Sequence, residues 1–367
     1  MDVVGLSKEL IRYDTRIPCG NEEGAARFLG RMLEAEGFAV DYPEFSKGRL
    51  NLIASKGLKN TVAPIVFTGH LDVVPLGDAE WSVDPFEGVI KSGKLYGRGA
   101  TDMKSAVAAM TLAAIDSFKD TVPKGGVKLI ITANEEPGCL GAKKLKNSDY
   151  PIGSASALIV GEPTSNQPLL GHKGALYLQA RSFGKTAHSS APHLGDNAIY
   201  KAARAIVEIA NLDFGARPHE LLGLPTINVG KFSGGQNLNS VPDYAEFTID
   251  VRTTPELEND IIYDRLTSIL GEEIVLEKLV DLKPVESDPK NPFVQMVLSL
   301  CNSHSCDKKS AAYLTDASVL TPWLGGVPTI ILGPGEAEMA HQVDEFCYID
   351  SIRNAYQLYM DIIKENN

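Results

Sequence analysis

Apolar residues in the first third of the chain fall into short runs that alternate with longer segments of helical character. Ile65–Thr68, Val127–Ala133 and Ala157–Val160 are apolar runs of strand length. Asn21–Gly37 begins with a good N-capping residue and ends in glycine, as many helices do. Asp102–Phe118 carries small and apolar residues around much of its circumference, which predicts a buried helix. This alternation predicts an α/β fold: a mainly parallel sheet with helices on both faces.

The pattern changes near Gly174 and changes back after Pro284. Ala175–Ser182 alternates as a half-exposed strand does, and the segments after it read as helix, strand, strand, helix, strand. These segments are Ala198–Ala210, Thr226–Lys231, Ala245–Arg252, Glu258–Leu270 and Glu273–Leu279. The order βαββαβ is that of a ferredoxin-like α+β fold. We therefore predict a catalytic α/β domain of residues 1–173 and 285–367, interrupted by an inserted domain of residues 174–284.

The amino-acid composition argues against some kinds of binding partner. The 367 residues include 35 Lys+Arg and 47 Asp+Glu, a net charge of −12, which argues against a nucleic acid or an anionic membrane surface. No apolar run approaches the ~20 residues of a membrane span, and the first ten residues do not resemble a signal peptide. Five cysteines without a CxxC pair are typical of reduced thiols. We expect a cytoplasmic protein.

Three familiar catalytic or nucleotide-binding motifs are incomplete or missing. GRGATD begins like a dinucleotide loop, but Asp102 stands where the last glycine belongs, and a carboxylate there would repel a pyrophosphate. GKT at Gly184–Thr186 resembles the end of a P-loop, yet Gln179 replaces the required earlier glycine. No GxSxG sequence is present, so a nucleophile elbow is not supported.

Histidines and carboxylates cluster instead around the ends of predicted strands. Each has an ordinary alternative explanation when taken alone: a surface pair, a helix N-cap, a solvated acidic loop, a turn or a loop histidine. Taken together, they follow four different predicted strands or begin the next helix, and ligands bind at the carboxyl ends of parallel strands. The residues concerned are His70, Asp72, Asp102, Glu135, Glu136, Glu162 and His341.

Two histidines and three carboxylates suit a two-metal site in which one carboxylate is shared. Zn²⁺ accepts such nitrogen and oxygen ligands and leaves room for water, and Co²⁺ or Mn²⁺ can substitute. Two such ions can lower the pKa of a bridging water and polarise a carbonyl. The remaining glutamate can take the proton of the water and pass it to a leaving nitrogen.

Five motifs in order, GHLDVVP, GRGATDMK, ANEEPGCLGA, GEPT and GPG…AHQVDE, resemble those of the co-catalytic zinc amidohydrolase and peptidase family. That family includes acetylornithine deacetylase, succinyl-diaminopimelate desuccinylase, aminoacylase and glutamate carboxypeptidase. The resemblance covers nearly the whole chain and implies a lid domain that often dimerises. It also implies that His70, Asp102 and Glu162 hold one zinc ion, while Asp102, Glu136 and His341 hold the other.

The resemblance implies further roles. Glu135 would be the general acid/base, and Asp72 would orient His70. His188, in GKTAHSSAPH, would stabilise the tetrahedral oxyanion. Asn239, in NSVP, and Arg252, in DVR, would bind the substrate carboxylate.

The predicted function is a di-zinc hydrolase that removes an N-acyl group from an amino acid with a free carboxylate. The stretch ILGPG…AHQ resembles the acetylornithine deacetylase branch, with succinyl-diaminopimelate desuccinylase, a dipeptidase or a carboxypeptidase as alternatives. Asp316, in LTDAS, would either contact a basic substrate side chain or cap the following helix. The partners expected are a small N-acylated amino acid or dipeptide and a second copy, in a homodimer formed through the lid. A non-catalytic binding relative is the other class, and the intact ligand set argues against it.

Overall fold

The computed structural model describes residues 1–59, 61–120, 122–303 and 310–366. The chain forms two compact units, Met1–Gly171 with Glu286–Asn367, and His172–Val285. The roles predicted for these parts, a zinc-binding domain and a lid, stay predictions. One of the seven histidines, His304, and one of the five cysteines, Cys306, lie outside the described residues. The other cysteines, Cys19, Cys139, Cys301 and Cys347, are free thiols.

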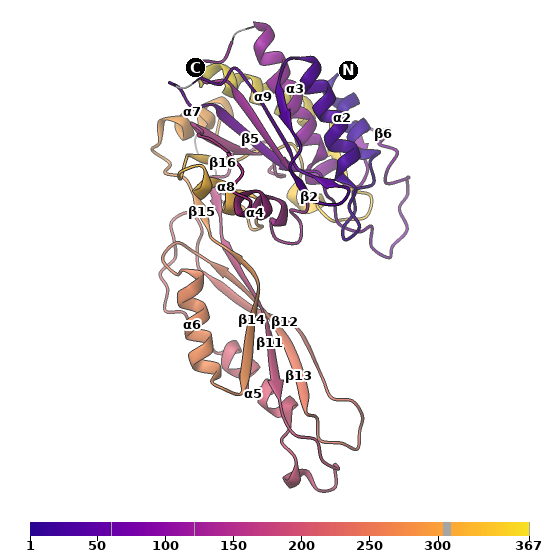
Figure 1. The fold of residues 1–367 in the computed structure, drawn as a ribbon, viewed down its shortest axis with the longest axis vertical. Coiled ribbons are helices and arrows are strands. Elements are labelled where there is room, and N and C mark those ends of the chain that lie inside the picture. Colours follow the sequence, from indigo (N-terminus) through magenta and orange to yellow (C-terminus); the bar gives the residue numbers. More distant parts are fainter. Residues whose placement is uncertain (60, 121, 304–309, 367) are drawn as a thin grey trace. The chain divides into compact units, whose positions relative to one another are not determined.

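A six-stranded sheet forms the centre of the first unit (Figure 1). Its strands, in spatial order, are β1 (Ala39–Asp41), β4 (Leu52–Lys56), β8 (Val127–Thr132), β5 (Ile65–His70), β9 (Ala157–Val160) and β16 (Thr329–Ile331). The last four are parallel to one another, whereas β4 is antiparallel to both β1 and β8. Every residue of β5, β8, β9 and β16 is buried, as expected for strands covered on both faces. The predicted mainly parallel sheet is confirmed.

Helices cover both faces of this sheet. On one face α3 contacts α1, α2 and α9, and α7 contacts α9, whereas α4 and α8 contact each other on the opposite face (Figure 1). The helices are α1 (Val3–Ile11), α2 (Glu22–Ala35), α3 (Ser105–Asp120), α4 (Leu140–Asn147), α7 (Pro292–Leu300), α8 (Ala317–Trp323) and α9 (Ile349–Glu365). The prediction that a helix begins at Asp102 is wrong. The backbone of Asp102, at φ −123° and ψ 93°, is not helical, and α3 begins three residues later.

Smaller sheets complete the first unit. One joins β17 (Phe346–Tyr348), β7 (Lys94–Tyr96) and β6 (Val89–Lys91), and another joins β2 (Glu44–Ser46) and β3 (Arg49–Leu50). The pairing of β7 with β17 brings the glycine-rich turn after β7 beside Glu345, whose carbonyl accepts a hydrogen bond from the Gly97 amide at 2.9 Å. Two further short strands, β10 (Gly171–His172) and β15 (Val285–Glu286), lie at the boundaries of the units.

The second unit contains four antiparallel strands and two helices in the order βαββαβ. They are β11 (Gly174–Phe183), α5 (Ala198–Ala210), β12 (Thr226–Gly234), β13 (Tyr244–Thr253), α6 (Asn259–Leu270) and β14 (Ile274–Leu282). Burial alternates along β11 and β13, so that Leu176, Leu178 and Phe247 face a core that α5 and α6 also enter. The side chain of Asn197 caps α5 by accepting hydrogen bonds from two backbone amides.

Across the described residues, no helix combines the length and the apolar character that crossing a lipid bilayer would require.

Candidate active site

The sheet brings most of the predicted site residues to one edge. His70 is the last residue of β5, Glu162 follows β9 by two residues, and Glu135 follows β8 by three. These strands are parallel neighbours, so their carboxyl ends lie together. Asp102 comes from the irregular turn that precedes α3, and His341 comes from the loop between β16 and β17.

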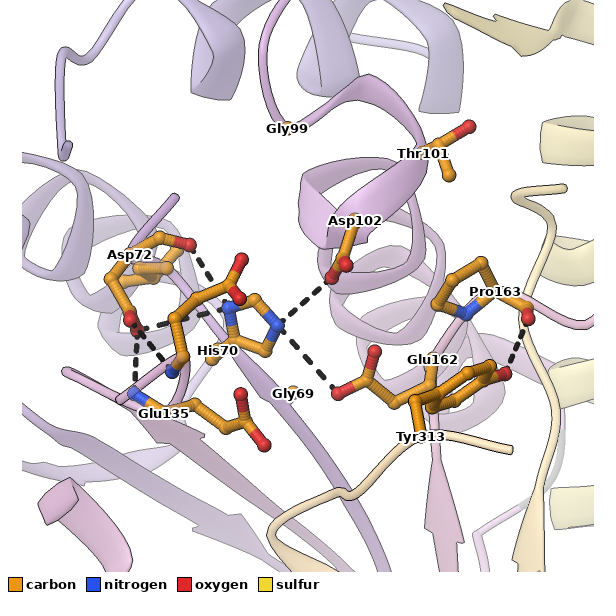
Figure 2. A network of polar contacts seen from close by, with 12 residues as sticks. Gly69, His70, Asp72, Gly99, Thr101, Asp102, Glu135, Glu162, Pro163 and Tyr313 are labelled. Atoms are coloured by element: carbon orange, nitrogen blue, oxygen red, sulfur yellow. Dashed lines mark hydrogen bonds and ion pairs between the residues drawn. The ribbon is translucent and has the colours of Figure 1, made fainter. Parts of the chain in front are cut away.

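The first ligand group consists of His70, Asp102 and Glu162 (Figure 2). His70 Nε2 lies 3.0 Å from Asp102 Oδ1 and 3.6 Å from Glu162 Oε1. The three side chains are only 1%, 12% and 5% exposed, respectively. An imidazole nitrogen and two carboxylate oxygens thus converge on one point in a largely dry environment.

The second ligand group consists of Asp102, Glu136 and His341. His341 Nε2 lies 3.5 Å from Asp102 Oδ2 and 3.1 Å from Glu136 Oε2. Asp102 therefore presents one oxygen to each histidine, which is the arrangement of a shared carboxylate. Glu136 Oε1 is buried and has no hydrogen-bond partner among the described residues. An unpartnered buried oxygen in a set of nitrogen and oxygen donors fits a divalent cation.

Electrostatics at this edge favour positive charge. Burial raises the pKa values of Glu135, Glu136 and Glu162 above the usual range for a glutamate. Hydrogen bonds to Asp102 and Glu136 raise the pKa of His341 to about 10. Burial alone would raise the pKa of Asp102, but hydrogen bonds from the two histidines lower it. The carboxylates thus hold protons on the histidines, and bound cations would take the place of those protons.

Asp72 contacts both His70 and the loop that carries Glu135. His70 Nδ1 lies 2.9 Å from the Asp72 backbone carbonyl, whereas the Asp72 carboxylate lies 3.7 Å away (Figure 2). That carboxylate instead accepts hydrogen bonds from the backbone amides of Glu135, at 2.9 Å, and Glu136, at 3.1 Å. The backbone carbonyl fixes the tautomer of His70, which leaves Nε2 free to bind a metal. The carboxylate holds the loop that carries Glu135 and Glu136.

Glu135 lies in a buried cluster with Cys139 and Asp316. Cys139 Sγ is 3.5 Å from Glu135 Oε1, and Thr132 Oγ1 donates a hydrogen bond to Asp316. Asp316 occupies the N-cap position of α8, but its side chain makes no capping hydrogen bond, so the capping alternative is wrong. Burial raises the pKa of Asp316 to about 6. A contact between Asp316 and substrate stays a prediction.

Three further residues support the site and were not singled out from the sequence. Tyr313 donates a hydrogen bond, 2.5 Å long, to the carbonyl of Pro163, the residue after Glu162 (Figure 2). Arg98 and Glu345 form a buried ion pair of 2.7 Å. Arg98 lies in the GRGATDMK motif and Glu345 in AHQVDE, so their places in the motifs were the available signal.

The remaining predicted residues belong to the second unit. His188 forms a β-bridge with Ser240, and the Ser189 amide donates to the Asn239 carbonyl at 3.0 Å, so His188 and Asn239 lie on adjoining segments. Arg252, on β13, instead pairs with Asp250 at 2.9 Å, and its guanidinium lies 5.1 Å from the centre of the Tyr177 ring. The substrate roles of His188, Asn239 and Arg252 stay predictions.

Comparisons with known proteins identify the family. Residues 66–365 match the model of peptidase family M20/M25/M40. The chain is 33% identical to a probable succinyl-diaminopimelate desuccinylase of Staphylococcus epidermidis, over 99% of this chain and 97% of that protein. It is also 33% identical to an acetylornithine deacetylase of Vibrio vulnificus, over 88% of this chain and 86% of that protein.

A solved structure shares the fold. The metallo-carboxypeptidase Sso-CP2 of Sulfolobus solfataricus superposes with a TM-score of 0.83 at 20% identity, over 100% of this chain and 99% of that one. The family match and the two relatives together decide the class: the chain belongs to peptidase family M20/M25/M40 and is a metal-dependent amidohydrolase.

Proposed function

We propose that the protein removes an acyl group from the α-nitrogen of an amino acid that has a free carboxylate. The observation that carries this proposal is the pair of ligand groups that share Asp102 and lie beside the buried carboxylate of Glu135. When bound, two divalent cations, with zinc as the metal proposed, would supply Lewis acidity to the substrate carbonyl and to water. His70 and Glu162 would hold one ion, Glu136 and His341 the other, and Asp102 would bridge both.

Glu135 is proposed as the group that moves the proton. It would accept a proton from the attacking water and return it to the leaving nitrogen. Burial raises the pKa of its carboxyl well above the usual range, which favours holding that proton, and nearby cations would favour its release. Asp72 supports this role because its carboxylate fixes the backbone of Glu135.

The second unit is proposed to supply substrate contacts and a dimer interface. His188 would stabilise the oxyanion, and Asn239 and Arg252 would bind the substrate carboxylate. Exposed apolar side chains support self-association through this unit: Tyr200 and Val207 on α5 are 65% and 58% exposed, and Phe232 on the edge strand β12 is 44% exposed. Measurement of the molar mass in solution, with Tyr200→Glu as the disrupting variant, would test the dimer.

Acetylornithine is the first substrate proposed, because of the resemblance of ILGPG…AHQ, and succinyl-diaminopimelate is the second. Relatives named for each activity are 33% identical to this chain. The test is a hydrolysis screen of N-acetyl and N-succinyl amino acids and dipeptides, with Zn²⁺ or Co²⁺ added. Cleavage of dipeptides alone would overturn the deacylase proposal in favour of a dipeptidase or carboxypeptidase.

Glu135→Gln tests the mechanism. We expect kcat to fall by roughly 10²–10⁴-fold, while the number of bound metal ions stays that of the wild type. Glu87→Gln is a matched control, because Glu87 is an exposed residue of the same unit. Substantial residual activity in Glu135→Gln would refute the role of Glu135.

A further inference from the structure

The buried carboxylate of Glu345 binds the turn that carries Asp102. Its Oε1 accepts hydrogen bonds from the backbone amides of Thr101, at 2.8 Å, and Asp102, at 3.1 Å. Its Oε2 accepts from the Gly99 amide at 3.0 Å and from Arg98 Nη1 at 2.7 Å. One carboxylate therefore accepts hydrogen bonds from three backbone amides of a non-helical turn and sets the backbone from which the shared ligand projects.

The guanidinium of Arg98 binds the loop that carries His341. Its Nη1 donates to the Gln342 carbonyl at 3.2 Å, and its Nη2 donates to the carbonyls of Pro75, at 3.0 Å, and His341, at 3.5 Å. Arg98 is 1% exposed and lies 5.0 Å from the ring centre of Trp81. Only the planar, multi-donor head of an arginine reaches this many acceptors at once.

The Arg98–Glu345 pair thus joins the backbones of two ligands of the second group, Asp102 and His341. Among the described hydrogen bonds of the pair, Asp102 is the one member of the first group that it reaches; the other two ligands, His70 and Glu162, project from the ends of β5 and β9. We propose that Arg98 and Glu345 are positioning residues that set the affinity of the second metal position, made by Asp102, Glu136 and His341, for a divalent cation. This inference rests on the proposed two-metal function.

Net stability of the fold is a weak alternative explanation for the pair. A buried ion pair gains little, because the cost of desolvating both charges offsets their attraction. The same unit contains a comparison: Arg49 and Glu22 are also buried, with Arg49 Nε 2.9 Å from Glu22 Oε2. In the described part of the chain, Arg49 and Glu22 hydrogen-bond to each other and to no ligand segment, although the charge of Glu22 contributes to raising the pKa of Asp72. Glu22→Gln is therefore a matched control for Glu345→Gln.

The experiment is a calorimetric titration of metal-free full-length protein with Co²⁺, followed in parallel by visible absorption. The wild type should bind two ions. In Glu345→Gln, we expect one ion to bind with wild-type affinity and the other to bind roughly 10–100-fold more weakly, the range measured for residues that support metal ligands. Glu22→Gln should leave both affinities unchanged. Equal weakening of both ions in Glu345→Gln, or no weakening, would overturn the proposal.

A double-mutant cycle assigns the affected position. In a His341→Ala background the second position has already lost a ligand, so adding Glu345→Gln should not weaken the remaining ion further. Additional weakening there would place the effect at the first group and overturn the proposal. If Glu345→Gln does not fold, Arg98→Lys decides the question, because it keeps the charge but loses the contacts to the His341 loop.

The titration separates this inference from the proposed function. A wild type that binds two ions but hydrolyses none of the screened amides overturns the proposed function, and the positioning role is still judged by the affinities. A wild type that binds a single ion overturns both.

Discussion

The two ligand groups share Asp102 but are built from different kinds of structure. His70 and Glu162 extend from the ends of neighbouring parallel strands and are 1% and 5% exposed. His341 lies in a loop, has a left-handed backbone with φ of 65°, and exposes 51% of its side chain. Ligands at strand ends are placed by the register of the sheet, whereas a ligand on a loop needs contacts of its own to hold it.

The contacts around each group follow this difference. Near the first group, the support beyond the sheet comes from local contacts: the Asp72 carbonyl lies 2.9 Å from His70 Nδ1, and Tyr313 donates a hydrogen bond to the carbonyl after Glu162. Near the second group, the Arg98–Glu345 pair makes hydrogen bonds to the loop that carries His341 and to the turn that carries Asp102. The first group should therefore tolerate loss of local support better than the second, and the predictions below are arranged to test this.

The largest effect is expected from Asp102→Asn, because Asp102 is common to both groups. The amide removes the negative charge that faces His70 and His341, so both ions should bind more weakly. We expect kcat/KM to fall roughly 10³-fold or more, since each bound ion accounts for several kcal/mol of transition-state stabilisation. Metal analysis after dialysis should find fewer than two ions. Retention of both ions at wild-type affinity would contradict a bridging role.

Removing one histidine from each group should separate stability from metal binding. His70→Ala leaves the buried carboxylates of Asp102 and Glu162 without their cationic partner, so metal-free protein should lose about 3–5 kcal/mol of unfolding free energy. His341→Ala removes a half-exposed partner and should cost about 1 kcal/mol or less. Urea unfolding of the metal-free variants measures both values, and metal analysis should find one ion lost from each. Equal destabilisation would contradict the contrast between the groups.

The next prediction concerns how the stability of the metal-free protein depends on pH. The folded state raises the pKa of His341 to about 10, from an ordinary value near 6.5. The folded state therefore binds this proton more tightly than the unfolded chain, and the resulting stability is complete below about pH 6.5 and lost as pH rises towards 10. The raised pKa values of Glu135, Glu136 and Glu162 act in the same direction.

Unfolding of metal-free protein between pH 6.5 and pH 8 should therefore show falling stability; above pH 8 the buried Lys104, whose pKa burial lowers to about 8, acts in the opposite sense. His341→Gln should reduce the slope, because one of the titrating groups is gone. Metal affinity should change in the opposite sense and rise with pH, since an ion must displace the proton on His341. Stability that rises between pH 6.5 and pH 8 in the metal-free wild type would contradict the ionisation described for the site.

Local signals were enough to locate many of the elements. The helix predicted at Ala198–Ala210 is α5 at these bounds, and the apolar run Ala157–Val160 is β9. Short strands such as β7 and β17 were not predicted, because three residues contain too little pattern and their pairing is distant in sequence. The start of α3 was misplaced because Asp102 is a good N-cap residue, and local preference does not reveal the Glu345 carboxylate that holds the turn non-helical.

The candidate site also contains residues that the sequence predicted and residues that it did not. The rule that ligands gather at the carboxyl ends of parallel strands was enough to select His70, Glu135 and Glu162. Arg98 and Glu345 are separated by 247 positions, and neither has a local pattern that predicts a partner. Closeness in sequence suggested the link between Asp72 and His70, but not the hydrogen bonds from the Glu135 loop, 63 positions away, to the Asp72 carboxylate. Long-range hydrogen bonds to backbone leave no periodic trace in a sequence.

The smallest effect is expected from Tyr313→Phe, which removes the hydrogen bond to the Pro163 carbonyl. The loss should cost about 1 kcal/mol of unfolding free energy, as should Tyr150→Phe, a matched control that removes a 2.7 Å hydrogen bond to Asp41 on the edge strand β1. Because β9 places Glu162, both ions should still bind to Tyr313→Phe within about threefold of the wild type, a difference under 1 kcal/mol. A tenfold loss at one ion would show that the sheet alone does not hold the first group, and the contrast between strand-end and loop ligands would fail.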